Sequence, residues 1–233
     1  MYDYWLGGKD NFAADRMAAR AALAAYPGMA RLARENRAFL RRVVRYLAGE
    51  AGVRQFLDIG TGIPTAGNTH EIAQEVAPEC RVVYVDYDPV VLTHARALLA
   101  SKPEGTTAYL DADLRDTVTL LEKAAQTLDF TEPVAVTMLA VLHAVGDEDD
   151  PHAIVARIMR AVPSGSYLAS PTSRRSLRPS NWTGPGTAST ASATSSTPTA
   201  ATPRSCDSST AWSWSSPDWW SCGTGGPPSK PAG

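Results

Sequence analysis

Glycine and aspartate residues follow two apolar segments at a spacing typical of nucleotide-binding sites. In the stretch FLDIGTGIPTAGNTHEIAQ, an apolar segment ends at Asp58 and continues into Gly60-Thr61-Gly62. Glycines at this place let the backbone approach a ligand closely, because no Cβ stands in the way. Asp86 ends the next apolar segment, VVYVD, and a carboxylate there accepts hydrogen bonds from both ribose hydroxyls. Together the two segments predict a nucleoside-binding site.

The third glycine of a dinucleotide fingerprint is absent from this turn. The pattern GxGxxG places glycine at position 65, where the chain has Thr65 after Pro64. This difference disfavours a pyrophosphate packed on the next helix, although the ribose of NAD remains compatible with Asp86. S-adenosylmethionine (SAM) has no pyrophosphate and presents the same ribose hydroxyls. NAD is therefore the weaker alternative.

Polar residues also follow the third and fourth apolar segments. Asp113 is placed to accept a hydrogen bond from an adenine amino group, with Leu114 beside the ring. His143 is more often a hydrogen-bonded neighbour of such a site than a catalytic base. Simpler roles remain open for the acidic residues, because Asp58 or Asp86 can also cap a turn or a helix. No catalytic residue is evident from the sequence.

The order of apolar and amphipathic segments predicts how these residues are brought together. The two kinds of segment alternate, which predicts an α/β fold with a Rossmann-like parallel sheet, flanking helices and an N-terminal helical segment. Ligands of such sheets bind at the carboxyl ends of the strands. We expect strands at 54–59, 81–85, 107–110, 134–142 and 166–169, and helices at 29–48, 68–76, 88–100 and 150–161.

Bulk composition limits the classes of function. The 233 residues are 44% hydrophobic with a formal charge of −2, which is typical of a globular protein and gives no electrostatic reason to expect nucleic acid. No apolar run approaches the roughly 20 residues that span a bilayer, and the charged start MYDYWLGGKD is unlike a signal peptide. We expect a cytoplasmic protein without membrane contact. Cys80, Cys206 and Cys222 lack metal-ligand spacing, which disfavours a disulfide framework or a zinc site.

The composition changes abruptly at Ser170. From there onward the chain has one leucine and no Val, Ile, Phe or Met, yet it holds five of the six tryptophans. Such a segment buries too little aliphatic surface to offset the entropy of ordering it, roughly 1–2 kcal/mol per residue for the backbone. We expect an N-terminal helical cap over 1–50, a Rossmann-like ligand-binding domain over 51–169 and a disordered, low-complexity tail over 170–233.

With these residues in view, the chain resembles the S-adenosyl methyltransferases of actinomycetes, a branch of the Rossmann-like class I methyltransferases. The resemblance is carried by YDYWLGGKDNFAADR, ENRAFLRRVVRYLA, QFLDIGTGIPTAGNTHE, VVYVDYDPVVLTHARALL, ADLRD and VLHAVGDEDDP. It covers Met1 to about Ala169, and the GGKDNF opening followed by NRAFL is not a general Rossmann feature. Relatives have a few residues before MYDYW, so we expect this chain to begin at an internal methionine.

The resemblance implies a role for each part of the site. The segment from Asp58 to Gly62 would line the methionine part of SAM, Asp86 would hold the ribose, and Asp113 with Leu114 the adenine. The residues expected to contact the cofactor are Asp58, Gly60, Thr61, Gly62, Asp86, Tyr87, Asp113, Leu114, His143, Tyr4, Lys9 and Arg37.

The resemblance also places an N-terminal segment over the pocket, together with Arg37. That segment contains Tyr4, Gly7, Gly8, Lys9 and Asn11. Lys9 and Arg37 are candidates for pairing the SAM carboxylate, and either can equally be a surface charge.

The implied function is that of a SAM-dependent methyltransferase acting on an unidentified small-molecule acceptor. The sulfonium of SAM already activates the methyl group, so transfer needs positioning and a dry pocket more than a strong acid or base. That requirement accounts for clear cofactor residues without a catalytic group. A SAM- or nucleoside-binding protein without turnover is the alternative, followed by an NAD-dependent oxidoreductase. The oligomeric state is not readable from the sequence.

The tail departs from the family, whose members continue past the fifth strand with another helix and a β-hairpin. We considered a shifted reading frame, in which each new codon joins the third base of one present codon to the first two bases of the next. In that frame the codons of Asp218-Trp219-Trp220 encode Leu-Val, because tryptophan has a single codon. Residues 206–226 then permit an alternation of apolar and polar residues that suits a hairpin. We expect a frameshifted tail and a fold without its C-terminal strands, with a natural Ser/Thr/Pro-rich tail as the alternative.

Overall fold

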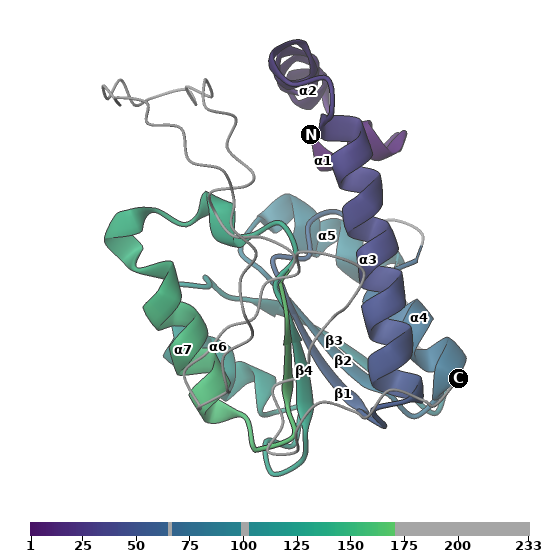
Figure 1. The fold of residues 1–233 in the computed structure, drawn as a ribbon, viewed down its shortest axis with the longest axis vertical. Helices are drawn as coiled ribbons and strands as arrows, with labels where there is room; N and C mark the ends of the chain where they lie inside the picture. Colours follow the sequence, from purple (N-terminus) through teal and green to yellow (C-terminus); the bar gives the residue numbers. More distant parts are fainter. Residues whose placement is uncertain (65–66, 99–102, 171–233) are drawn as a thin grey trace, which may run out of the picture.

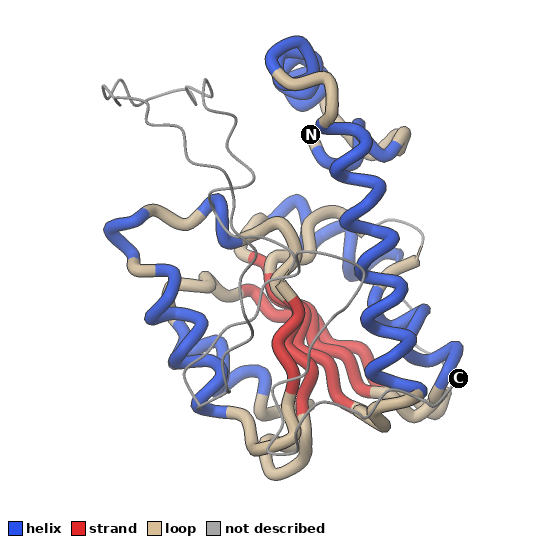
Figure 2. The backbone as a smooth tube through the Cα atoms, viewed as in Figure 1, coloured by secondary structure: helices blue, strands red, loops and turns tan. Residues whose placement is uncertain are grey.

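The computed structural model describes residues 1–64, 67–98 and 103–170, so the expectations for the tail lie outside the described residues. A five-stranded sheet runs through the centre in the order β3-β2-β1-β4-β5 (Figure 2). The strands are β1 (Gln55–Ile59), β2 (Arg81–Asp86), β3 (Thr106–Asp111), β4 (Val134–Thr137) and β5 (Tyr167–Ala169). Every neighbouring pair is parallel, so the carboxyl ends of the strands share one edge. The α/β class and the parallel sheet are confirmed.

Helices cover both faces of this sheet. Figure 1 shows α3 and α4 on one face and α6 and α7 on the other, with α1 and α2 near the start of α3. The α-helices are α1 (Tyr2–Leu6), α2 (Ala13–Ala25), α3 (Met29–Gly49), α4 (Thr69–Val76), α5 (Pro89–Leu98), α6 (Thr117–Ala124) and α7 (Pro151–Ala161). Two short 3₁₀ helices, η1 (Leu142–Ala144) and η2 (Asp147–Asp149), precede α7. Among the described helices, none combines the length and apolar composition needed to cross a membrane.

The central strand β1 is buried along its whole length, as expected for a parallel sheet covered on both sides. Its side chains alternate between two apolar clusters. Leu57 and Ile59 pack with the cluster that includes α6 and α7, whereas Phe56 packs with α3 and α4. Asp58 therefore belongs to the face that carries α3 and α4.

Two helix starts follow the signals read from the sequence. Asn68 and Glu71 form a reciprocal capping box at the start of α4, and the backbone N–H of Asn68 donates to Glu71 Oε2 at 3.1 Å. Asp150 caps α7 by accepting from the backbone N–H of Ala153 at 3.1 Å, with Pro151 in the first turn.

The fourth strand is shorter than predicted. The apolar run predicted a strand over 134–142, but β4 ends at Thr137. Ala140 has a φ of 55°, which lies in the left-handed region and cannot belong to a strand. The chain therefore leaves the sheet after Thr137, and η1 begins five residues later. An apolar run alone does not reveal where such a strand stops.

Candidate functional site

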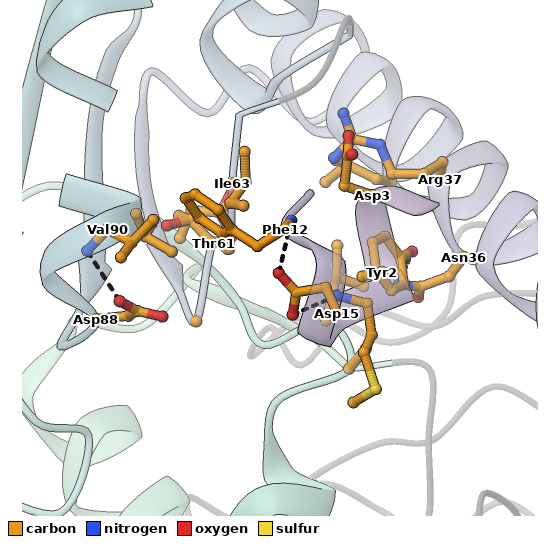
Figure 3. Close-up of a pocket in the computed structure, with 18 residues that line it drawn as sticks. Tyr2, Asp3, Phe12, Asp15, Asn36, Arg37, Thr61, Ile63, Asp88 and Val90 are labelled. Atoms are coloured by element: carbon orange, nitrogen blue, oxygen red, sulfur yellow. Dashed lines mark hydrogen bonds and ion pairs between the residues drawn. The ribbon is translucent and has the colours of Figure 1, made fainter. Parts of the chain in front are cut away.

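A cavity of about 340 Å³ opens beside the carboxyl ends of β1 and β4 (Figure 3). The strand order reverses between these two strands, and open α/β sheets bind their ligands at such a switch point. Its walls come from the turn after β1, the segment after β4, the start of α5, the middle of α3 and the N-terminal segment. The lining residues are Met1, Tyr2, Asp3, Phe12, Asp15, Asn36, Arg37, Leu40, Asp58, Gly60, Thr61, Gly62, Ile63, Asp88, Val90, Val91, Leu139 and Ala140.

The turn after β1 depends on glycine. Gly60 and Gly62 have φ values of 75° and 63°, which residues with a Cβ rarely adopt. The N–H of Gly60 donates to the carbonyl of Val85 at 2.8 Å, so the turn stays joined to β2. A Cβ at Gly60 would also overlap the side chain of Val141. The glycines thus allow the backbone itself to form the cavity wall.

Asp86 connects the ends of the two strands. Its Oδ2 accepts from the backbone N–H of Gly62 at 2.9 Å, and its Oδ1 accepts from the N–H of Asp88 at 3.0 Å. A carboxylate offers about four acceptor positions, so two bonds hold it in place and leave capacity for ligand hydroxyls. Asp86 does not itself line the cavity, and its contact with a ribose stays a prediction.

Asp58 is a buried carboxylate clamped by two threonines. Thr69 Oγ1, on α4, donates to Oδ2 at 2.5 Å, and Thr137 Oγ1, at the end of β4, donates to Oδ1 at 2.8 Å. Burial raises the pKa of Asp58, while the two hydroxyl bonds and the charge of Arg37 oppose that rise. The clamp fixes a carboxylate in the cavity wall, directly before the glycine turn.

The cavity wall holds five of the residues expected to contact a cofactor, and the remaining seven lie elsewhere. The five are Asp58, Gly60, Thr61, Gly62 and Arg37. Asp113 is paired with Arg115, whose Nη2 lies 2.5 Å from Oδ2, and this pairing lowers the pKa of the carboxyl. Leu114 packs in the core, while Tyr87 and His143 are exposed. Adenine contacts by Asp113 and Leu114 stay predictions.

In the N-terminal segment, the residues that line the cavity differ from those expected. Tyr4 accepts a hydrogen bond from Arg20 Nε at 3.3 Å, and Lys9 is exposed; neither lines the cavity. The wall instead holds Tyr2, Asp3 and Phe12. Figure 3 shows the Phe12 ring reaching from this segment toward Thr61 and Ile63. The GGKDNF motif indicated the segment, but its sequence does not show which side chains face inward.

Tyr2 ties the N-terminal segment to α3. Its hydroxyl donates to the carbonyl of Ala33 at 3.0 Å and accepts from Asn36 Nδ2 at 2.9 Å. Burial raises the pKa of this tyrosine, so the hydroxyl stays neutral. One end of the cavity is therefore held by α1 and α3 together.

Comparisons with known proteins identify the family of this chain. Residues 1–206 match the family model described as S-adenosyl methyltransferase. A DUF574 family protein from Streptomyces avermitilis MA-4680 has 55% identity and a TM-score of 0.70, over 72% of this chain and 65% of that one. A protein from Thermobifida fusca YX, named as a methyltransferase, has 48% identity and a TM-score of 0.65, over 72% and 63%. The chain thus spans less than two thirds of the length of either protein. Among curated proteins nothing matches.

The family model covers well over half of the chain, including every residue of the cavity wall. This match confirms the resemblance read from the sequence. The chain belongs to the S-adenosyl methyltransferase family, whose cofactor is SAM.

Proposed function

We propose that this protein is a SAM-dependent methyltransferase acting on a small-molecule acceptor, with the cofactor held against the glycine turn and Asp86. The observation that carries the proposal is the bond from the Gly62 N–H to Asp86 Oδ2 at 2.9 Å. It holds the Asp86 carboxylate against the glycine turn that follows β1, where ribose hydroxyls can donate to it. The ribose of an adenosyl group can bond to Asp86 beside the glycine turn, and the sequence lacks the third glycine of a dinucleotide-binding turn.

The residues of the wall fit this cofactor. Thr61 Oγ1 is buried and, among the described residues, has no hydrogen-bond partner, which a ligand at the turn can provide. A Cβ at Gly62 would meet no protein atom within 4 Å, so the space beside this residue is open for a ligand. Bound SAM supplies a methyl group that its sulfonium already activates. The chain's own task is to position the cofactor and exclude water.

The size and lining of the cavity favour a small acceptor. A volume of about 340 Å³ lies near the lower end of the roughly 300–1,000 Å³ typical of small-molecule sites. Leu40, Leu139 and Phe12 add apolar surface to the wall. A bound cofactor therefore leaves limited room, and the space left beside its methyl group sets the size of the acceptor.

Calorimetry with SAM, S-adenosylhomocysteine (SAH) and NAD tests the cofactor. The unaltered protein is expected to bind both adenosyl compounds, and Asp86→Ala to weaken them roughly tenfold or more, since charged hydrogen bonds contribute about 1.5–3 kcal/mol. Asp111→Ala is the matched control, because Asp111 pairs with Asp86 in register on β3 and is exposed. Unchanged SAM affinity in Asp86→Ala, or binding of NAD alone, would contradict the proposal. SAH formation with candidate acceptors tests turnover.

A further inference from the structure

The opening motif YDYWLGGKDNF is folded around one carboxylate. The backbone N–H of Gly8 donates to the carbonyl of Asp3 at 2.9 Å, and Asn11 Nδ2 donates to Asp3 Oδ2 at 2.7 Å. A Cβ at Gly8 would overlap the Asp3 carboxylate, so this close approach requires glycine. Asp3 is only 5% exposed. The motif therefore buries a charged group at a defined place.

The buried carboxylate of Asp3 forms part of the cavity wall. Within the described residues, Asn11 is the only side chain that donates to it, and it forms no ion pair. Burying a carboxylate is costly unless a cation or several hydrogen bonds compensate. A cationic group bound in the cavity would provide that compensation.

Arg37 supplies the opposite charge at the same end of the cavity. It lines the wall as Asp3 does, and in the view of Figure 3 both side chains lie on the side of α3, away from Asp88 and Val90. Its Nη2 donates to the carbonyl of Gly67 at 2.9 Å, which anchors the guanidinium beside the turn that precedes α4. The wall thus presents one carboxylate and one guanidinium from two different elements, α1 and α3.

We propose that Asp3 and Arg37 together bind the amino-acid end of SAM, Asp3 its α-ammonium group and Arg37 its α-carboxylate. The inference rests on the proposed function and specifies the orientation of the cofactor. Asp86 holds the ribose at the end of β2, so the amino-acid end extends toward α3. The ammonium and carboxylate groups of the amino-acid end complement this pair of side chains. Hydrogen bonds between charged groups are stronger than those between neutral groups, and a guanidinium can form two parallel hydrogen bonds with a carboxylate.

Asp58 is a second buried carboxylate in the wall, and its bonding differs from that of Asp3. Each oxygen of Asp58 already accepts a threonine hydroxyl, at 2.5 and 2.8 Å. In Asp3 the described residues bond Oδ2 alone, through Asn11. Asp3 therefore has more capacity for a bound ammonium group. Asp58 instead joins the end of β1 to α4 and β4, directly before the glycine turn.

Calorimetry on the full chain separates the ends of the cofactor with three ligands. SAH carries both charged groups, deamino-SAH carries only the carboxylate, and 5′-methylthioadenosine carries neither. The unaltered protein is expected to bind SAH roughly tenfold more tightly than deamino-SAH. Asp3→Asn keeps the acceptor for Asn11 and is expected to remove that difference, while deamino-SAH and 5′-methylthioadenosine change less than about twofold. Arg37→Gln is expected to weaken SAH and deamino-SAH, but not 5′-methylthioadenosine.

Two control variants remove a nearby exposed charge without changing Asp3 or Arg37. Asp10→Asn removes an exposed charge from the same turn, and Arg41→Gln removes one from the next turn of α3; both should leave all three affinities unchanged. Equal affinity of the unaltered protein for SAH and deamino-SAH overturns the inference without any variant. So does an equal loss for all three ligands in Asp3→Asn, which would indicate a purely structural role. If no adenosyl compound binds the unaltered protein, the proposed function itself fails.

Discussion

The clamp on Asp58 leads to a prediction about stability and its dependence on pH. Thr137→Val removes the hydroxyl that donates to Asp58 Oδ1 at 2.8 Å and preserves the shape of a fully buried side chain. A hydrogen bond to a charged group contributes about 1.5–3 kcal/mol. For a folded body of this size each kcal/mol corresponds to roughly 2–4 °C in Tm, so a loss of about 2 kcal/mol lowers Tm by roughly 4–8 °C at neutral pH.

The loss should shrink in acid. Burial raises the pKa of Asp58 above its usual 3.8, so ionisation of this group opposes folding, and its contribution to stability falls as pH rises through the folded-state pKa. The Thr137 bond lowers that pKa, so Thr137→Val raises it and increases the loss wherever Asp58 is ionised. Below the unfolded pKa the carboxyl is neutral in both states, and the bond contributes only about 0.5–1.5 kcal/mol.

Urea denaturation at pH 7, and at the lowest pH where the unaltered protein remains folded, measures both values. Thr137→Ser keeps the hydroxyl and separates its effect from that of the methyl group. In an Asp58→Asn background the pH-dependent part of the Thr137→Val effect should vanish. The same loss at both pH values, or a pH dependence that persists in the Asp58→Asn background, would refute the reasoning.

Three further predictions follow from other parts of the chain. Gly60→Ala should destabilise the fold by about 2 kcal/mol or more and weaken SAM binding, because its φ is 75° and its Cβ would overlap Val141; wild-type Tm would contradict the close approach. Burial raises the pKa of the Cys80 thiol to about 11, so this thiol should not react with Ellman's reagent in native protein at pH 8. Cys80→Ser should therefore leave the number of reactive thiols unchanged in native protein and lower it by one in denatured protein. Resequencing the gene should reveal a shift of the reading frame after about codon 170, and the original frame should encode Leu-Val where the present one encodes Asp218-Trp219-Trp220. A sequence that confirms the present frame would contradict the frameshift.

Local patterns in the sequence were sufficient for the order of the five strands and for α3, α4, α5 and α7, whereas α6 was not predicted. A buried strand followed by Gly60 and Gly62 predicted a tight glycine turn, and both glycines have positive φ values that most other residues do not adopt. The position of Asp86 beside this turn was predictable because the carboxyl ends of parallel strands share one edge, and its contact with a ligand stays a prediction. The caps at Asn68 and Asp150 were readable because a cap acts over three residues.

Tertiary structure decided the features that depend on contacts between distant elements. Asp113 follows a strand as Asp86 does, but Asp113 is paired with Arg115, whereas Asp86 bonds to the turn after β1. The end of β4 could not be predicted from the sequence, because Ala140 belongs to the same apolar run although its positive φ takes the chain out of the strand. Asp3 was missed for a similar reason. Its spacing in the motif shows neither that Gly8 and Asn11 enclose its carboxylate nor that α1 packs against α3, and only those contacts bring it into the cavity wall.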